Sequence, residues 1–89
     1  MPVQTLAIIN AKGLHARASA RFVEVVEAHD AAAEVTKDGM TVSGDSIMGL
    51  LMLAASRGTS IEVTTSGPQA EMLASALQAL VANSFGEDY

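Results

Sequence analysis

The period at which apolar residues recur changes several times along the chain, and each period predicts one kind of element. An apolar, β-branched run predicts a strand over 3–9, and apolar residues that alternate with polar ones predict strands over 33–36, 40–43 and 61–65. Lys37-Asp38-Gly39 joins the middle two strands as a hairpin, since an Asp-Gly pair tolerates a positive φ. These segments predict four strands.

Three other segments show the helical period. One helix is predicted over 16–29, where apolar or small residues recur as Ser19/Ala20, Phe22/Val23 and Val26. A second helix begins at Ser46, where Asp45 and Ser46 offer capping oxygens, and runs through Leu53. Gly67-Pro68 favours a third helix, because proline suits the first helical position. Its expected buried stripe is Met72/Leu73, Ala76/Leu77 and Leu80/Val81, and the tail after Asn83 is expected to fray.

The order strand, helix, strand, strand, helix, strand, helix is typical of an α+β fold. A strand along which apolar and polar residues alternate has one solvent-exposed face and one buried face, so we expect a four-stranded antiparallel sheet with three helices on one face. Such an arrangement is an open-faced β-sandwich. We expect a single domain over 1–89, because a second hydrophobic core would need about 50 residues of its own.

Composition excludes several classes of function. Five basic and ten acidic residues give a net charge of −5, so we expect no nucleic-acid partner. The chain has no cysteine and only two histidines, so we expect no metal site, and its length leaves little room for a cofactor. The N-terminus shows no signal peptide, and the longest apolar stretch, 47–55, is too short for membrane insertion. We expect a cytoplasmic monomer.

The segment Gly13-Leu14-His15-Ala16-Arg17 is expected at a loop-to-helix junction, where unpaired N–H groups and the helix dipole favour anions. A neutral imidazole nitrogen is a competent nucleophile. A phosphoryl group on His15 could be bound by the amides of Ala16 and Arg17 and by the Arg17 guanidinium. The alternative is that His15 merely caps the helix and Arg17 is solvated.

Two further features indicate a surface for a partner. Lys12, Arg17 and Arg21 are three of the five basic residues and lie close to His15 in the sequence, although a solvated helix face would give the same count. The second predicted helix is apolar on every side, so part of it is either an exposed docking patch or sunk in the core. We predict partner contacts through Lys12, Ala20, Arg21, Ile47, Met48, Gly49, Leu51 and Met52.

Two motifs, Asn10–Arg17 (NAKGLHAR) and Ser46–Met52 (SIMGLLM), closely resemble the HPr family, the histidine-containing phosphocarriers of the bacterial phosphoenolpyruvate-dependent phosphotransferase system. The resemblance spans essentially the whole chain. It implies that His15 accepts a phosphoryl group through Nδ1 from enzyme I and donates it to IIA-type proteins, assisted by Arg17. It also implies that Ser46 matches the serine that an HPr kinase/phosphorylase modifies in some branches, weakening phosphoryl acceptance.

Several positions qualify this resemblance. Ala18 stands where the family normally has proline, so we expect the helix to start at the same place with a less rigid first turn. Asp45 would repel a phosphate on Ser46. The segments 67–69 and 83–88 resemble the nitrogen-related, NPr-like branch. A rival interpretation is a non-catalytic regulatory module that acts through the helix Ser46–Leu53 without chemistry at His15.

Overall fold

The computed structural model describes residues 1–86 and contains the predicted elements in the predicted order. The strand and helix bounds are β1 (Val3–Ala7), α1 (Ala16–Glu27), β2 (Ala32–Lys37), β3 (Met40–Ser43), α2 (Ile47–Met52), β4 (Ser60–Ser66) and α3 (Ala70–Ala82). A short 3-10 turn, η1 (Ser84–Gly86), follows α3. The α+β class and the order β-α-β-β-α-β-α are therefore confirmed.

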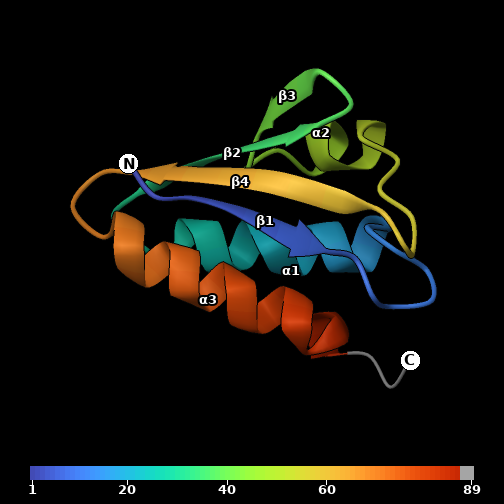
Figure 1. Cartoon of the computed structure of the whole chain (residues 1–89). Helices are drawn as coiled ribbons and strands as arrows, with labels where there is room; N and C mark the ends of the chain where they lie inside the picture. Colours follow the sequence, from blue (N-terminus) through green and yellow to red (C-terminus); the bar gives the residue numbers. More distant parts are fainter. Residues whose placement is uncertain (87–89) are drawn as a thin grey trace.

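The four strands form one antiparallel sheet in the order β1-β4-β2-β3. Glu62 of β4 lies opposite Thr5 of β1 on one side and Thr36 of β2 on the other. Helices α1 and α3 run side by side beneath one face of the sheet, while the other face is uncovered (Figure 1). The short helix α2 packs against α1 and β3. This is the open-faced sandwich that the alternating strands predict.

The hydrophobic core lies between the sheet and its helices. Along β4, Ile61, Val63 and Thr65 are buried while Ser60 and Glu62 are exposed, as a period of two requires. Helix α1 contributes Phe22, and α3 contributes Leu73 and Leu77, all of them fully buried. Each such side chain stabilises the fold by roughly 1.5–3 kcal/mol relative to an exposed one.

Several element boundaries differ from prediction by one or two residues, and backbone contacts mark three of them. β1 ends at Ala7 rather than Ile9, since Ile8 bonds to the loop at Gly58 and Thr59 instead of to β4. Helix α1 ends at Glu27 rather than 29, with Ala28 as its C-cap. Helix α3 begins at Ala70 rather than at Pro68, because the Gln69 N–H donates to the Asp30 carbonyl and Gln69 becomes the N-cap.

Two predictions about the third helix and its tail are wrong. Met72 is 59% exposed and does not belong to the buried stripe, and Ala76 and Leu80 are only half-buried. The chain does not fray directly after Asn83, because Phe85 in η1 is completely buried. The remainder of the predicted tail, 87–89, lies outside the described residues.

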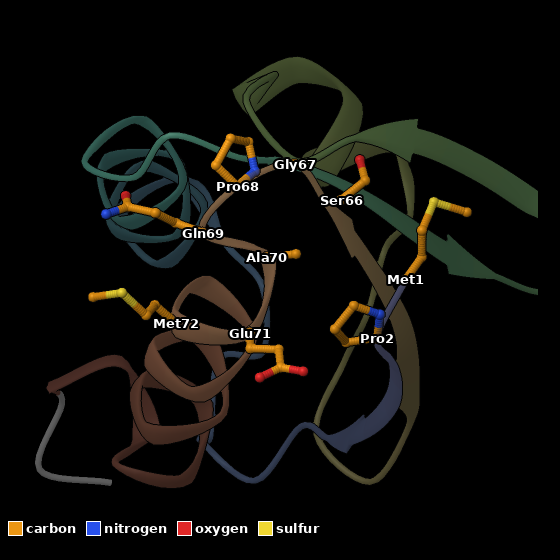
Figure 2. Close-up of a pocket in the computed structure, with 9 residues that line it drawn as sticks. All are labelled: Met1, Pro2, Ser66, Gly67, Pro68, Gln69, Ala70, Glu71 and Met72. Carbon is orange, nitrogen blue, oxygen red and sulfur yellow. The ribbon is translucent and has the colours of Figure 1, made fainter.

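A cleft lies where β1 begins and β4 ends, away from the candidate site. It encloses about 450 Å³, and Figure 2 shows Met1 and Pro2 on one side and the first turn of α3 on the other. Its lining includes one carboxylate, Glu71, but no histidine and no basic side chain. The register, which pairs Val3 with Thr64 and Ala7 with Ser60, places this cleft at the opposite end of the sheet from the loop that follows β1.

Candidate functional site

His15 lies at the junction that the sequence predicts, as the N-cap of α1. Its backbone is extended, with φ −79° and ψ −175°, and its Nδ1 accepts a hydrogen bond from the Arg17 backbone N–H at 3.3 Å. A neutral ring in this arrangement carries its proton on Nε2 and keeps the lone pair on Nδ1. The imidazole is half-buried, so it is both oriented by the helix and reachable from solvent.

The loop that presents His15 is held close to the segment that follows α2. The Leu14 N–H donates to the Ala55 carbonyl at 2.8 Å. Gly13 has φ +65°, and a Cβ at this position would collide with the backbone of Ala55 and Ser56. Only glycine meets both demands, which is the physical reason for this residue two positions before His15.

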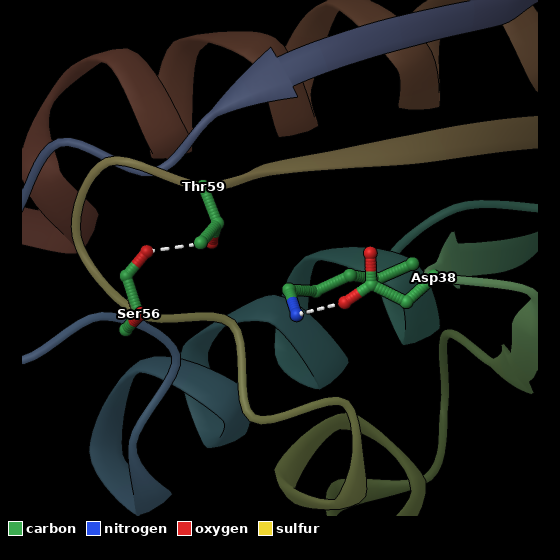
Figure 3. A network of polar contacts seen from close by, with 4 residues as sticks. Asp38, Ser56 and Thr59 are labelled. Carbon is green, nitrogen blue, oxygen red and sulfur yellow. Dashed lines mark hydrogen bonds and ion pairs between the residues drawn. The ribbon is translucent and has the colours of Figure 1, made fainter.

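A cavity of about 300 Å³ opens beside the imidazole. It is lined by Lys12, Leu14, His15, Leu51, Ala54, Ala55 and Ser56. The turn beneath it is closed by a hydrogen bond from the Thr59 hydroxyl to the Ser56 carbonyl at 2.6 Å (Figure 3). No local motif marks residues 54–56 as part of the site, and only the fold brings them to His15.

Lys12 lines this cavity, and three other basic residues lie near its lining in the sequence. Lys12, Arg17 and Arg21 are exposed, and so is Arg57, which directly follows a lining residue and was not predicted as part of the site. The fifth basic residue, Lys37, instead pairs with Asp38 in the β2–β3 turn, at 2.7 Å between Nζ and Oδ2 (Figure 3). A chain of net charge −5 thus places four of its five cations on or beside the segments that form the site.

Arg21 has a defined neighbour at the end of the described chain. A Cβ built on Gly86 would lie 3.2 Å from Nη1 of Arg21. The end of η1 therefore packs against the Arg21 side chain. The buried Phe85 anchors η1, which contacts α1 as well as α3. The carboxyl-terminal turn therefore bounds the basic surface of α1.

Helix α2 is capped by Ser46, whose Oγ accepts from the Gly49 N–H at 3.0 Å. Only Leu50 within the helix is fully buried. Its other large apolar side chains form an exposed surface, which we name the α2 patch: Ile47 at 41%, Met48 at 70%, Leu51 at 37% and Met52 at 64% exposure. The interpretation of α2 as a helix sunk in the core is therefore wrong for these four residues.

The α2 patch and His15 belong to one continuous surface. Leu51 is a member of the patch and also lines the cavity beside the imidazole. Helix α2 packs directly against α1, which carries Arg17, the half-buried Ala20 and Arg21. A protein that covers the patch would therefore also reach the imidazole.

Gly49 has a structural role in the packing of α2. Gly49 is predicted as a partner contact, and a Cβ at this position would lie 3.0 Å from Val42 Cβ and 3.2 Å from Ser46 Oγ. The glycine therefore fits α2 tightly against β3 and the capping hydroxyl. It supports the α2 patch from below.

The described part of the chain holds no group of three or more His, Cys, Asp or Glu residues that could bind a metal ion. His29 lies away from His15 at the far end of α1, where its Nδ1 is 2.7 Å from the Val25 carbonyl oxygen. Within residues 1–86, no helix is long and apolar enough to cross a membrane.

Comparison with known proteins gives a consistent result. The model of the family described as "PTS HPr component phosphorylation site" matches residues 3–83. The chain is 45% identical over 84 residues to phosphocarrier protein HPr of Neisseria meningitidis serogroup A, covering 94% of each chain. The structure of HPr-C-His from Thermoanaerobacter tengcongensis superposes with a TM-score of 0.95 at 35% identity, over all of both chains. An HPr dimer from the same organism superposes at 0.77 and 36% identity, over 98% of this chain and all of that one.

Proposed function

Because this chain belongs to the HPr family of the phosphotransferase system, whose members are phosphocarriers rather than enzymes, we propose that it carries the phosphoryl group on His15 Nδ1. The observation that carries the proposal is the hydrogen bond from the Arg17 N–H to this nitrogen. It orients the Nδ1 lone pair at the positive end of α1, where an incoming anion is stabilised.

The transfer step follows from this geometry. The Nδ1 lone pair attacks phosphorus, a new N–P bond forms, and the bond between phosphorus and the donor breaks with its electron pair returning to the donor. The His15 proton stays on Nε2. The Arg17 N–H, displaced from Nδ1, can then donate to a phosphoryl oxygen together with the Ala16 N–H and the exposed Arg17 guanidinium.

We propose enzyme I as the donor and an IIA-type protein as the acceptor. Both would dock on the α2 patch, whose methionines adapt to different partner surfaces. Lys12, Arg17, Ala20 and Arg21 would complete the interface beside the patch, with the three cations steering acidic partners. The resemblance of segments 67–69 and 83–88 to the NPr-like branch predicts an acceptor in nitrogen regulation, and an acceptor in sugar import is the alternative.

Ser46 is proposed as the regulatory phosphorylation site for an HPr kinase/phosphorylase. A phosphate on its Oγ would add about −1.5 to −2 charges at the edge of the α2 patch, opposing an apolar partner. Asp45, whose carboxylate accepts from the Ser43 hydroxyl, would add like charge beside it. Ser46→Asp should therefore weaken acceptance from enzyme I, whereas Ser60→Asp on the exposed side of β4 should not.

Labelling with phosphoenolpyruvate and enzyme I tests the carrier proposal. The wild-type chain should gain one phosphate that is labile in acid and stable in alkali. His15→Ala should gain none, whereas His29→Ala, which changes the other histidine, should be labelled normally. Label that persists in His15→Ala would contradict the assignment.

The second candidate function is a non-catalytic regulatory module that acts through Ser46–Leu53. It is favoured by the exposed α2 patch, which could bind a target without chemistry at His15. Gly49→Glu and Ser46→Asp would then both abolish regulation of the target, and His15→Ala would leave it intact. Loss of regulation in His15→Ala favours the carrier.

We propose that the carrier works as a monomer in the cytoplasm. The α2 patch consists of four side chains on a six-residue helix, whereas a standard stable interface takes about 20–30 residues from each partner. Light scattering on the purified chain should give the mass of one copy, 9.2 kDa, and a mass of twice that value would contradict the monomer.

A further inference from the structure

Buried polar side chains are rare in this fold, and their positions are uneven. Within residues 1–86 the fully buried polar residues are Asn10, Ser19 and Thr65. Two of them, Asn10 and Ser19, form hydrogen bonds to the two residues that immediately precede His15. Burying an amide or a hydroxyl is unfavourable unless hydrogen bonds compensate, so these positions call for an explanation beyond core packing.

The contacts hold two consecutive carbonyl groups. The Asn10 side-chain Nδ2 donates to the Gly13 carbonyl at 2.8 Å, and the Ser19 hydroxyl donates to the Leu14 carbonyl at 3.3 Å. The Gly13 N–H returns a bond to the Asn10 carbonyl at 3.1 Å, which closes the turn. The Ser19 N–H also bonds the His15 carbonyl at 2.8 Å. Both peptide planes before His15 are thereby fixed from inside the protein.

We propose that Asn10 and Ser19 are positioning residues for phosphoryl transfer, acting together as a buried clamp on the loop that presents His15. This inference rests on the proposed role of His15 as phosphoryl acceptor. Both side chains are 0% exposed, so neither can touch a phosphoryl group or a partner protein. Their effect reaches the reaction through the backbone of Gly13 and Leu14.

The clamp acts on the orientation of one lone pair. With the Gly13 and Leu14 carbonyls fixed, His15 keeps the extended backbone that places Nδ1 against the Arg17 N–H. Loss of either contact allows the loop to sample other orientations, and the fraction of molecules with Nδ1 aligned for attack decreases. Misplacement of a reacting atom by about 1 Å can slow a reaction about 100-fold.

Asn10→Ala and Ser19→Ala test the clamp, with Thr65→Val as the matched control. Thr65 is equally buried, and its hydroxyl donates to the Ala70 carbonyl at 2.9 Å at the opposite end of β4. The two clamp variants should lower kcat for phosphorylation by enzyme I by about 10-fold or more. KM for enzyme I should change less than about twofold, because the α2 patch is unaltered. Thr65→Val should lose thermal stability but keep kcat.

Nuclear magnetic resonance gives a readout that does not depend on turnover. In both clamp variants the Arg17 amide proton should exchange faster with solvent and the ¹⁵N shift of His15 Nδ1 should move, while Thr65→Val leaves both unchanged. If folded Asn10→Ala and Ser19→Ala keep the wild-type kcat and the Arg17 amide protection, the clamp proposal is wrong. If Asn10→Ala does not fold, Ser19→Ala, which loses only one hydroxyl, decides. A wild-type chain that takes no label refutes the carrier function, and the amide exchange still tests the clamp.

Discussion

The backbone N–H of Arg17 donates to Nδ1 of His15 across 3.3 Å, so the atom that caps α1 is also the proposed phosphoryl acceptor. Capping and chemistry are therefore not competing roles for this imidazole. The cap aligns the lone pair while the site is empty, and its donor is already in place to bind an oxygen of the incoming phosphoryl group.

The Arg17 side chain should matter for the rate of transfer rather than for folding. Arg17→Ala removes an exposed guanidinium and should lower kcat for phosphorylation by about 10- to 100-fold, with the melting temperature nearly unchanged. Arg17→Lys should recover only part of the rate, because an ammonium group lacks the planar fork. Arg21→Ala, one turn along the same helix, is the control and should raise KM without a comparable loss of kcat.

The α2 patch should govern affinity for enzyme I. Met48→Glu places a charge on the most exposed side chain of the patch and should raise KM by about 10-fold, equivalent to about 1.4 kcal/mol, with kcat retained. Met72→Glu introduces the same charge at a 59% exposed methionine on α3 and should leave KM unaltered. Steady-state phosphorylation at several carrier concentrations measures KM for both variants. Equal KM values for Met48→Glu and Met72→Glu would show that the α2 patch is not part of the interface.

Gly13 should tolerate no side chain. Gly13→Ala would force alanine into an unfavourable φ of +65° and would also bring its Cβ into collision with the backbone of Ala55 and Ser56. Gly39→Ala has only the unfavourable φ, +82°, because no atom lies near its Cβ. We expect Gly39→Ala to cost about 1 kcal/mol of unfolding free energy and Gly13→Ala clearly more, with slower phosphorylation. Urea denaturation of both variants measures the difference, and equal losses would show that the loop has room at Gly13.

Ala54, which lines the cavity beside His15, carries backbone strain. Its φ is +52°, a left-handed conformation that glycine adopts without penalty. Ala54→Gly should raise the free energy of unfolding by up to about 1 kcal/mol. Ala79→Gly, at an exposed position inside α3, should lower the free energy of unfolding by about the same amount, because glycine is less favourable than alanine inside a helix. Thermal melts should therefore shift in opposite directions, and a lowered melting temperature for Ala54→Gly would contradict the strain.

The carboxyl-terminal turn should contribute strongly to stability. Phe85→Ala empties a fully buried site and should lower the free energy of unfolding by about 3–5 kcal/mol. Met72→Ala, at an exposed position of α3, should change it by less than about 0.5 kcal/mol. Chemical denaturation of the two variants checks the expectation, and a small effect of Phe85→Ala would mean that η1 is not anchored.

Local pattern was sufficient for the order of the elements and for the position of His15. A period of two or of 3.6 depends on neighbouring residues, and so do the cap at Ser46 and the turn at Asp38 and Gly39. The segment Gly13 to Arg17 is contiguous, so its residues meet whatever the rest of the chain does. For these features the information lies within a few residues, and the prediction agreed with the structure.

Contacts between distant segments determined the remainder. The exposure of Met72, the burial of Phe85 and the exposed faces of α2 depend on which surface each side chain meets after the helices pack, and an apolar residue favours burial without specifying where. Ala54 to Ser56 join His15 because the Leu14 N–H bonds Ala55, about 40 positions along the chain. No periodicity encodes such a meeting, because it arises from the combined packing of the sheet, α1 and α2.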